Sequence, residues 1–171
     1  DGSVRIAFLL TLVAYAVLVV VAALVLPERV PLHFGFGGEA DRWGTRTEAV
    51  LTFGLLGAGL AVVLGGGAEL SSRLPLRSPW VNLPHKAWWT ATPEREMRAR
   101  ERLRHDLYVI AIAVMVLVSA VLVLTLVAAR TEEARLPGGS GLSIGVLVVV
   151  LVGGLALVLW QFRRFRPEGE S

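Results

Sequence analysis

Four long stretches without a charged side chain constrain this 171-residue chain more than any other feature of its sequence. Each is about twenty residues or longer, which is the length that an α-helix needs to cross roughly 30 Å of hydrocarbon. A backbone in lipid must satisfy its own hydrogen bonds, and these stretches lack the alternating polarity of membrane-barrel strands. The sequence therefore predicts four membrane-spanning helices, at about 6–26, 49–68, 107–129 and 142–162.

The composition agrees with a membrane domain. Hydrophobic residues make up 54% of the chain and the mean hydropathy is +0.64. Charged residues make up 18%, against about 25% in typical soluble domains. The first apolar run is too long for the core of a signal peptide, so we expect it to be retained as a span. The predicted fold is one all-α domain over 1–171, an integral membrane four-helix bundle.

The distribution of basic residues predicts the orientation. Eight Arg and Lys lie in the 69–106 connection, three in the C-terminal tail and one, Arg5, at the N-terminus, against three in the connection 27–47 and two in 130–140. Because positive loops stay in the cytoplasm, both termini and 69–106 are expected inside, and 27–47 outside. The net charge of +3 then reflects topology, and we expect no nucleic-acid partner. Anionic lipids are expected along Arg73–Arg104, at Arg73, Arg77, Lys86, Arg95, Arg98, Arg100, Arg102 and Arg104.

The outer connection 27–47 is dense in turn formers and aromatic residues, so we expect it to be ordered and packed over the bundle. Three of its side chains, His33, Glu39 and Asp41, could together ligate a divalent cation such as zinc or manganese. Their spacing matches no established metal motif. The favoured interpretation is that His33 bonds the loop backbone, while Asp41 holds a turn or pairs with an arginine. We therefore expect no resident cofactor, with a divalent metal as the alternative.

The cytoplasmic connection contains SPWVNLPHKAWWT at 78–90, with three tryptophans among cations. Such a composition is typical of a segment that lies at the lipid headgroups. His85 and Lys86 could instead belong to a ligand or partner site. Thr92, Pro93 and Glu94 form a helix start, with an N-cap, a proline in the first turn and an acid at the positive end. That helix is expected to be a solvated extension of the third span.

Both connections resemble a bacterial membrane-domain family of unknown function that forms the N-terminal part of SdpI-type proteins. SdpI-type proteins serve immunity and signal transduction in a sporulation-delaying toxin system. The resemblance covers roughly 26–107. In the outer connection it is carried by Pro31, His33, Phe34, Gly38, Asp41, Trp43 and Arg46. In the cytoplasmic connection it is carried by Asn82, Pro84, His85, Lys86 and Trp89. The resemblance implies a multi-pass protein of the bacterial cytoplasmic membrane.

The favoured function is non-enzymatic: an SdpI-like immunity, sensory or accessory subunit that recognises a ligand or partner through the outer connection. The chain has no cysteine and no HExxH. One alternative is an accessory subunit of a membrane transporter, as a homo-oligomer or beside another membrane subunit. Another is a metal-dependent enzyme at the outer interface, centred on His33, Glu39 and Asp41. The candidate binding residues are His33, Asp41, Trp43, Arg46, Asn82, His85 and Lys86.

Overall fold

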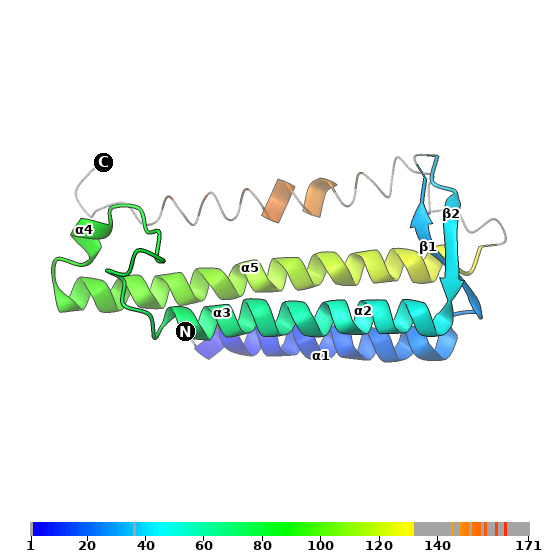
Figure 1. The fold of residues 1–171 in the computed structure, drawn as a ribbon, viewed down its shortest axis with the longest axis horizontal. Helices are drawn as coiled ribbons and strands as arrows, with labels where there is room; N and C mark the ends of the chain where they lie inside the picture. Colours follow the sequence, from blue (N-terminus) through cyan, green and yellow to red (C-terminus); the bar gives the residue numbers. More distant parts are fainter. Residues whose placement is uncertain are drawn as a thin grey trace.

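The structure is a computed structural model, and it describes residues 2–35, 37–131, 145, 148–150, 152–154, 156, 160 and 163. Its elements follow the chain in a simple order (Figure 1). They are α1 (Gly2–Val25), β1 (Arg29–Phe34), β2 (Ala40–Thr45), α2 (Arg46–Leu60), the π-helical turn η1 (Ala61–Gly65), α3 (Gly66–Ser71), α4 (Lys86–Trp89) and α5 (Pro93–Ala128).

Three helices of the described residues are long and apolar enough to cross a membrane. They are Gly2–Val25, Arg46–Ser71 and Pro93–Ala128, the second being α2, η1 and α3 in continuous succession. The predicted spans at 6–26, 49–68 and 107–129 overlap these three helices, which have the length and composition of membrane spans. The fourth predicted span, 142–162, lies mostly outside the described residues.

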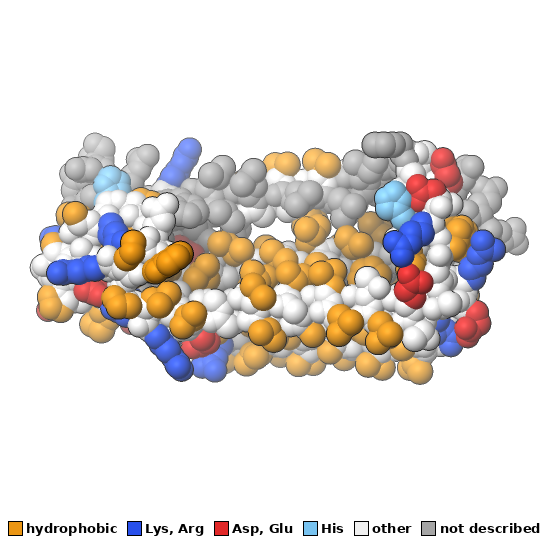
Figure 2. Space-filling model, in the orientation of Figure 1, with side chains coloured by type: hydrophobic (Ala, Val, Ile, Leu, Met, Phe, Trp, Pro, Cys, Tyr) orange, Lys and Arg blue, Asp and Glu red, His pale blue; other side chains and the backbone are white. Residues whose placement is uncertain are grey.

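The surface of the bundle divides into an apolar middle and two polar ends (Figure 2). On the face shown, hydrophobic side chains cover the middle, whereas the acidic and basic side chains gather toward the ends. Large apolar side chains of the second long helix are open to the surroundings, including Leu55 at 71% and Val62 at 73% exposed. A soluble protein rarely presents so extensive an apolar surface. The surface is the one expected of a chain whose solvent is the bilayer.

Two close contacts fix α1 against the second long helix. The Tyr15 ring of α1 lies directly on Gly57, where even a single added carbon would overlap it. The Tyr15 hydroxyl donates a hydrogen bond of 2.6 Å to the carbonyl of Phe53. Farther along, the Phe8 ring lies 2.8 Å from the position that a Cβ on Gly65 would occupy. Small residues let helix backbones approach closely, which is common between membrane helices.

The all-α prediction is wrong for the connection between the first two spans. β1 and β2 form an antiparallel two-stranded sheet, with Val30 opposite Gly44 and Pro31 opposite Trp43. Gly38 takes a positive φ of 82° in the turn, a conformation that glycine adopts without strain. We call residues 29–45 the hairpin. The connection is ordered and packed on the bundle, as expected, but through strands.

A second small core forms at the opposite end of the bundle. After α3 the chain makes turns, enters the four-residue α4 and then begins α5 at Pro93. The Thr92 hydroxyl caps α5 by accepting from the Arg95 backbone N–H at 3.4 Å, which confirms the predicted helix start. A separate cluster of buried side chains holds this region together. Its members are Leu76, Val81, Leu83, Trp89 and Ala99. We call residues 72–92 the inner loop, after the side of the membrane on which the sequence predicts them.

Candidate recognition site

The hairpin rests on the bundle through the N-terminal half of β1. Val30 is fully buried, and Pro31 is among the largest fully buried side chains. Pro31 has no N–H to donate, which strands tolerate at their edges and at irregular positions. Next to these residues, at the base of the hairpin, the Arg46 N–H donates to the Glu28 carbonyl at 3.2 Å. The sheet is thus attached at both its core face and its base.

The base of the hairpin also starts α2. Thr45 takes extended backbone angles, and its hydroxyl accepts from the Glu48 N–H at 3.1 Å. Thr-x-x-Glu is the signature of a capping box, so this helix start is readable in the sequence, although the span predicted there begins only at about residue 49. The Glu48 carboxylate then reaches back to Arg42 of β2 at 3.0 Å. The cap therefore joins the second strand to the helix.

Two further contacts tie the strands to each other and to the helix. Arg46 pairs with Glu28 at 3.0 Å, and the Arg29 guanidinium lies 4.7 Å from the centre of the Trp43 ring. Exposed ion pairs each contribute little, typically less than about 1 kcal/mol. Together, these contacts fix the orientation of one short sheet relative to α2. Of the predicted binding residues, Trp43 and Arg46 serve this internal network.

His33 and Asp41 form the pair that faces outward from the hairpin. His33 Nδ1 lies 2.6 Å from Asp41 Oδ1, and their side chains are 66% and 49% exposed. The strand register shifts on both sides of His33, between Pro31 and His33 and between His33 and Phe34. Such bulges redirect a side chain out of the regular pleat. The contact occupies Nδ1, which leaves Nε2 as the ring atom for a ligand arriving from solvent.

Glu39 does not join this pair as a third metal ligand. Within the described part of the chain, no three His, Cys, Asp or Glu side chains lie together as a group that could hold a metal ion. Glu39 instead serves the turn, where its carbonyl accepts from the Gly35 N–H at 2.9 Å. The expected partner of Asp41 was the backbone or an arginine, whereas the structure gives it His33. Metal binding by this turn stays a prediction, which metal analysis of the purified protein would test.

At the other end of the molecule, Lys86 stabilises the inner loop through hydrogen bonds to its backbone. Its ammonium donates to the carbonyls of Ser78 at 2.6 Å and Val81 at 2.9 Å. His85 precedes α4 with a positive φ of 54°, and its carbonyl accepts the N–H groups of Trp88 and Trp89. A lysine held by two carbonyls shapes the loop and is poorly placed to bind a ligand as well.

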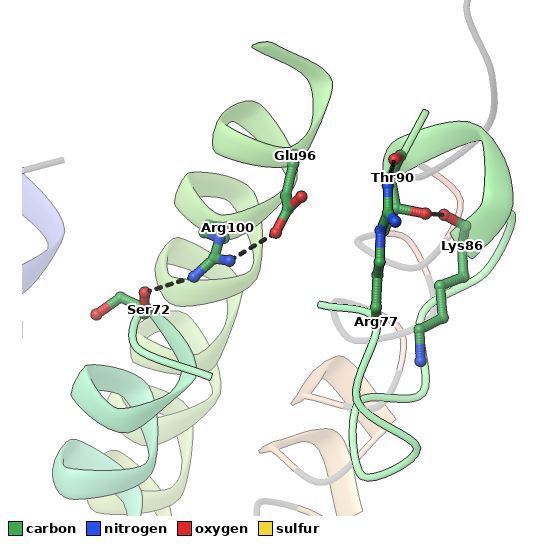
Figure 3. A network of polar contacts seen from close by, with 6 residues as sticks. All are labelled: Ser72, Arg77, Lys86, Thr90, Glu96 and Arg100. Atoms are coloured by element: carbon green, nitrogen blue, oxygen red, sulfur yellow. Dashed lines mark hydrogen bonds and ion pairs between the residues drawn. The ribbon is translucent and has the colours of Figure 1, made fainter. Parts of the chain in front are cut away.

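Arginines hold the rest of the inner loop in the same way (Figure 3). Arg77 donates to the Thr90 carbonyl at 2.9 Å, and the Thr90 hydroxyl donates to the Lys86 carbonyl at the same distance. Arg100 of α5 bridges the Ser72 carbonyl at 3.1 Å and Glu96 at 2.6 Å. These side chains close the loop onto α5.

The seven predicted binding residues therefore form two groups. His33, Asp41, Trp43 and Arg46 lie at the hairpin end, whereas Asn82, His85 and Lys86 lie at the inner-loop end, with the long helices between (Figure 1). A helix of the length of α1 spans about 36 Å at 1.5 Å per residue. The two groups do not make one site. The hairpin end offers the exposed polar pair, so it is the stronger candidate.

Comparison with known protein families finds a match over α1, the hairpin and α2. Residues 9–58 match a domain of unknown function, DUF1648. The match runs from α1 through the hairpin into α2, and the inner loop lies outside it. An uncharacterised protein from Archaeoglobus fulgidus is 41% identical over 62 residues, which cover 34% of this chain and 32% of that protein. The chain thus spans about a third of that relative's length. No solved structure matches the chain.

Proposed function

We propose that the chain is a non-enzymatic recognition subunit of the membrane, which binds a ligand or partner through the hairpin. The observation that carries this proposal is the exposed His33–Asp41 pair, mounted on a sheet that is attached to the bundle at its core face and its base. A rigid mounting lowers the entropy lost on binding, which favours recognition. The domain match centres on the same helix–hairpin–helix unit.

The membrane setting of this proposal follows from the sequence. We place the chain in a bacterial cytoplasmic membrane as a multi-pass protein, with the hairpin outside, both termini inside and a fourth span at 142–162. The resemblance to SdpI-type proteins supports an immunity, sensory or accessory role. A hairpin on the outer face would meet a ligand before it reaches the bilayer, which suits any of these roles.

Replacing the exposed pair tests the proposal. In a strain that lacks this gene, we expect the wild-type chain to restore the transcript profile of the parent. A chain with His33→Asn and Asp41→Asn together is expected to restore none of it, because a ligand loses both the imidazole and its orienting carboxylate. RNA sequencing gives the readout, and membrane fractionation checks that both chains insert equally.

A matched variant in the same turn separates recognition by the pair from metal binding. Glu39→Gln removes a carboxylate that the pair does not use, so it should behave as the wild type. Loss of function with Glu39→Gln, together with stoichiometric metal in the purified wild type, would favour the metal site instead. Full restoration by the His33→Asn, Asp41→Asn chain would refute the recognition role of the hairpin.

A further inference from the structure

A polar cluster lies where the three long helices meet the inner-loop end. The Tyr108 hydroxyl of α5 donates a hydrogen bond of 2.5 Å to Glu69 Oε1 of α3. Arg5 of α1 lies 3.6 Å from the same oxygen. Phe8 packs on the Tyr108 ring at a centroid distance of 5.3 Å. One carboxylate therefore links three helices at the boundary between their apolar spans and the charged end.

The cluster carries more positive than negative charge. Arg73 follows Glu69 by four residues, and Arg104 precedes Tyr108 by one helical turn on α5, so both lie near the carboxylate that Arg5 contacts, and the charges of all three arginines act on it. Glu69 can neutralise only one of them. The side chains of Arg5 and Glu69 are 62% and 37% exposed, so the cluster opens to the surroundings. An excess of positive charge at this depth favours an anion of the headgroup layer.

Other cations of this end are already engaged within the protein. Arg77, Lys86 and Arg100 donate to backbone carbonyls. Arg95 lies 4.1 Å from the centre of the Trp88 ring, and Arg102 lies 5.2 Å from that of Trp89. The sequence predicted anionic lipids along the whole inner connection. Because these cations already have partners in the protein, we expect the lipid contact at the cluster around Glu69.

We propose that Arg5, Arg73 and Arg104 bind the phosphate of an anionic phospholipid headgroup. A guanidinium offers a planar pair of donors that matches phosphate oxygens, and basic pockets between membrane helices are known to take such headgroups. The adjoining apolar surface suits the acyl chains, since Ile6 and Leu70 next to the cluster are 58% and 53% exposed. The inference does not depend on what the hairpin recognises.

Lipid binding to the purified full chain tests this site. Native mass spectrometry in detergent, with phosphatidylglycerol or phosphatidylcholine titrated in, gives the affinity for each lipid. We expect phosphatidylglycerol to bind at least tenfold more tightly. The Arg5→Gln, Arg73→Gln chain should lose roughly tenfold or more of that affinity, at about a factor of five per basic residue. Arg130→Gln, an exposed arginine at the other end of α5, should bind as the wild type.

A variant that is expected to raise the lipid affinity distinguishes loss of the binding site from misfolding. Glu69→Gln removes the competing negative charge and keeps an oxygen for Tyr108, so the affinity for phosphatidylglycerol should rise. The proposal is overturned if Arg5→Gln, Arg73→Gln binds phosphatidylglycerol like the wild type, if the two lipids bind equally, or if Glu69→Gln lowers the affinity. Inorganic phosphate at millimolar concentration should not displace the lipid; displacement would show a site for free phosphate.

Discussion

Replacing Gly57 by leucine is expected to break the contact between α1 and α2. The Tyr15 ring occupies the space that any side chain at Gly57 would need, and the Tyr15 hydroxyl is held at 2.6 Å by the Phe53 carbonyl. The ring cannot move aside without losing that bond. Overpacking a dense core costs about 1–3 kcal/mol, and we expect the upper end here because the backbone must separate. Unfolding in SDS, followed by tryptophan fluorescence, measures the change in free energy.

Gly59 provides the matched control on the same helix. A Cβ at Gly59 has nothing within 4 Å, so Gly59→Leu adds its side chain toward open space. Leucine also has a better helix propensity than glycine, by several tenths of a kcal/mol. Gly59→Leu should therefore be neutral or slightly stabilising. Equal losses of stability in the two variants would contradict the packing of Tyr15 on Gly57.

Replacing Trp89 by alanine is expected to open the inner loop. Trp89 is 1% exposed, and its ring meets Trp88 edge-on at a centroid distance of 4.8 Å. Emptying such a site typically costs about 3–5 kcal/mol. The core around Trp89 is small, so its remaining side chains should not hold the loop in place after this loss of stability. Limited proteolysis with trypsin should cut the variant at Arg77 or Lys86 while the membrane helices stay intact.

Trp80 is the control for that experiment. It belongs to the same loop but is 88% exposed, so Trp80→Ala removes no packing. Its proteolysis pattern in detergent should equal that of the wild type. Rapid cleavage of Trp80→Ala and slow cleavage of Trp89→Ala would mean that the buried cluster does not hold the loop.

The three long apolar helices were readable from the sequence because a bilayer imposes a simple rule on composition and length. The start of α5 was readable for a local reason, since Thr92 and Pro93 set both the cap and the first turn. The hairpin was missed because its prolines and glycines also suit an irregular loop. Val30 and Leu32 alternate with other residues in β1, but the bulges around His33 interrupt that period.

The sequence identified candidate residues for the site, but it did not show which other groups they contact. The sequence pointed to His33 and Asp41, yet their mutual contact depends on a strand register that the sequence does not display. Lys86 was one candidate for a ligand or partner site, and in the structure its ammonium donates to two carbonyls of its own loop. Tertiary hydrogen bonds of this kind join residues whose spacing carries no periodic signal. The link from Glu69 to Tyr108 is another example.

Labelling of single cysteines in intact cells tests the central claim most directly, because these 171 residues contain no cysteine. A membrane-impermeant maleimide should label Glu39→Cys in intact cells and Ala91→Cys only after the membrane is opened. Leu55→Cys should stay unlabelled in both conditions although its side chain is open on the protein surface, because lipid covers it. Labelling of Leu55→Cys in intact cells, or of Glu39→Cys and Ala91→Cys from the same side, would contradict a chain folded across the bilayer.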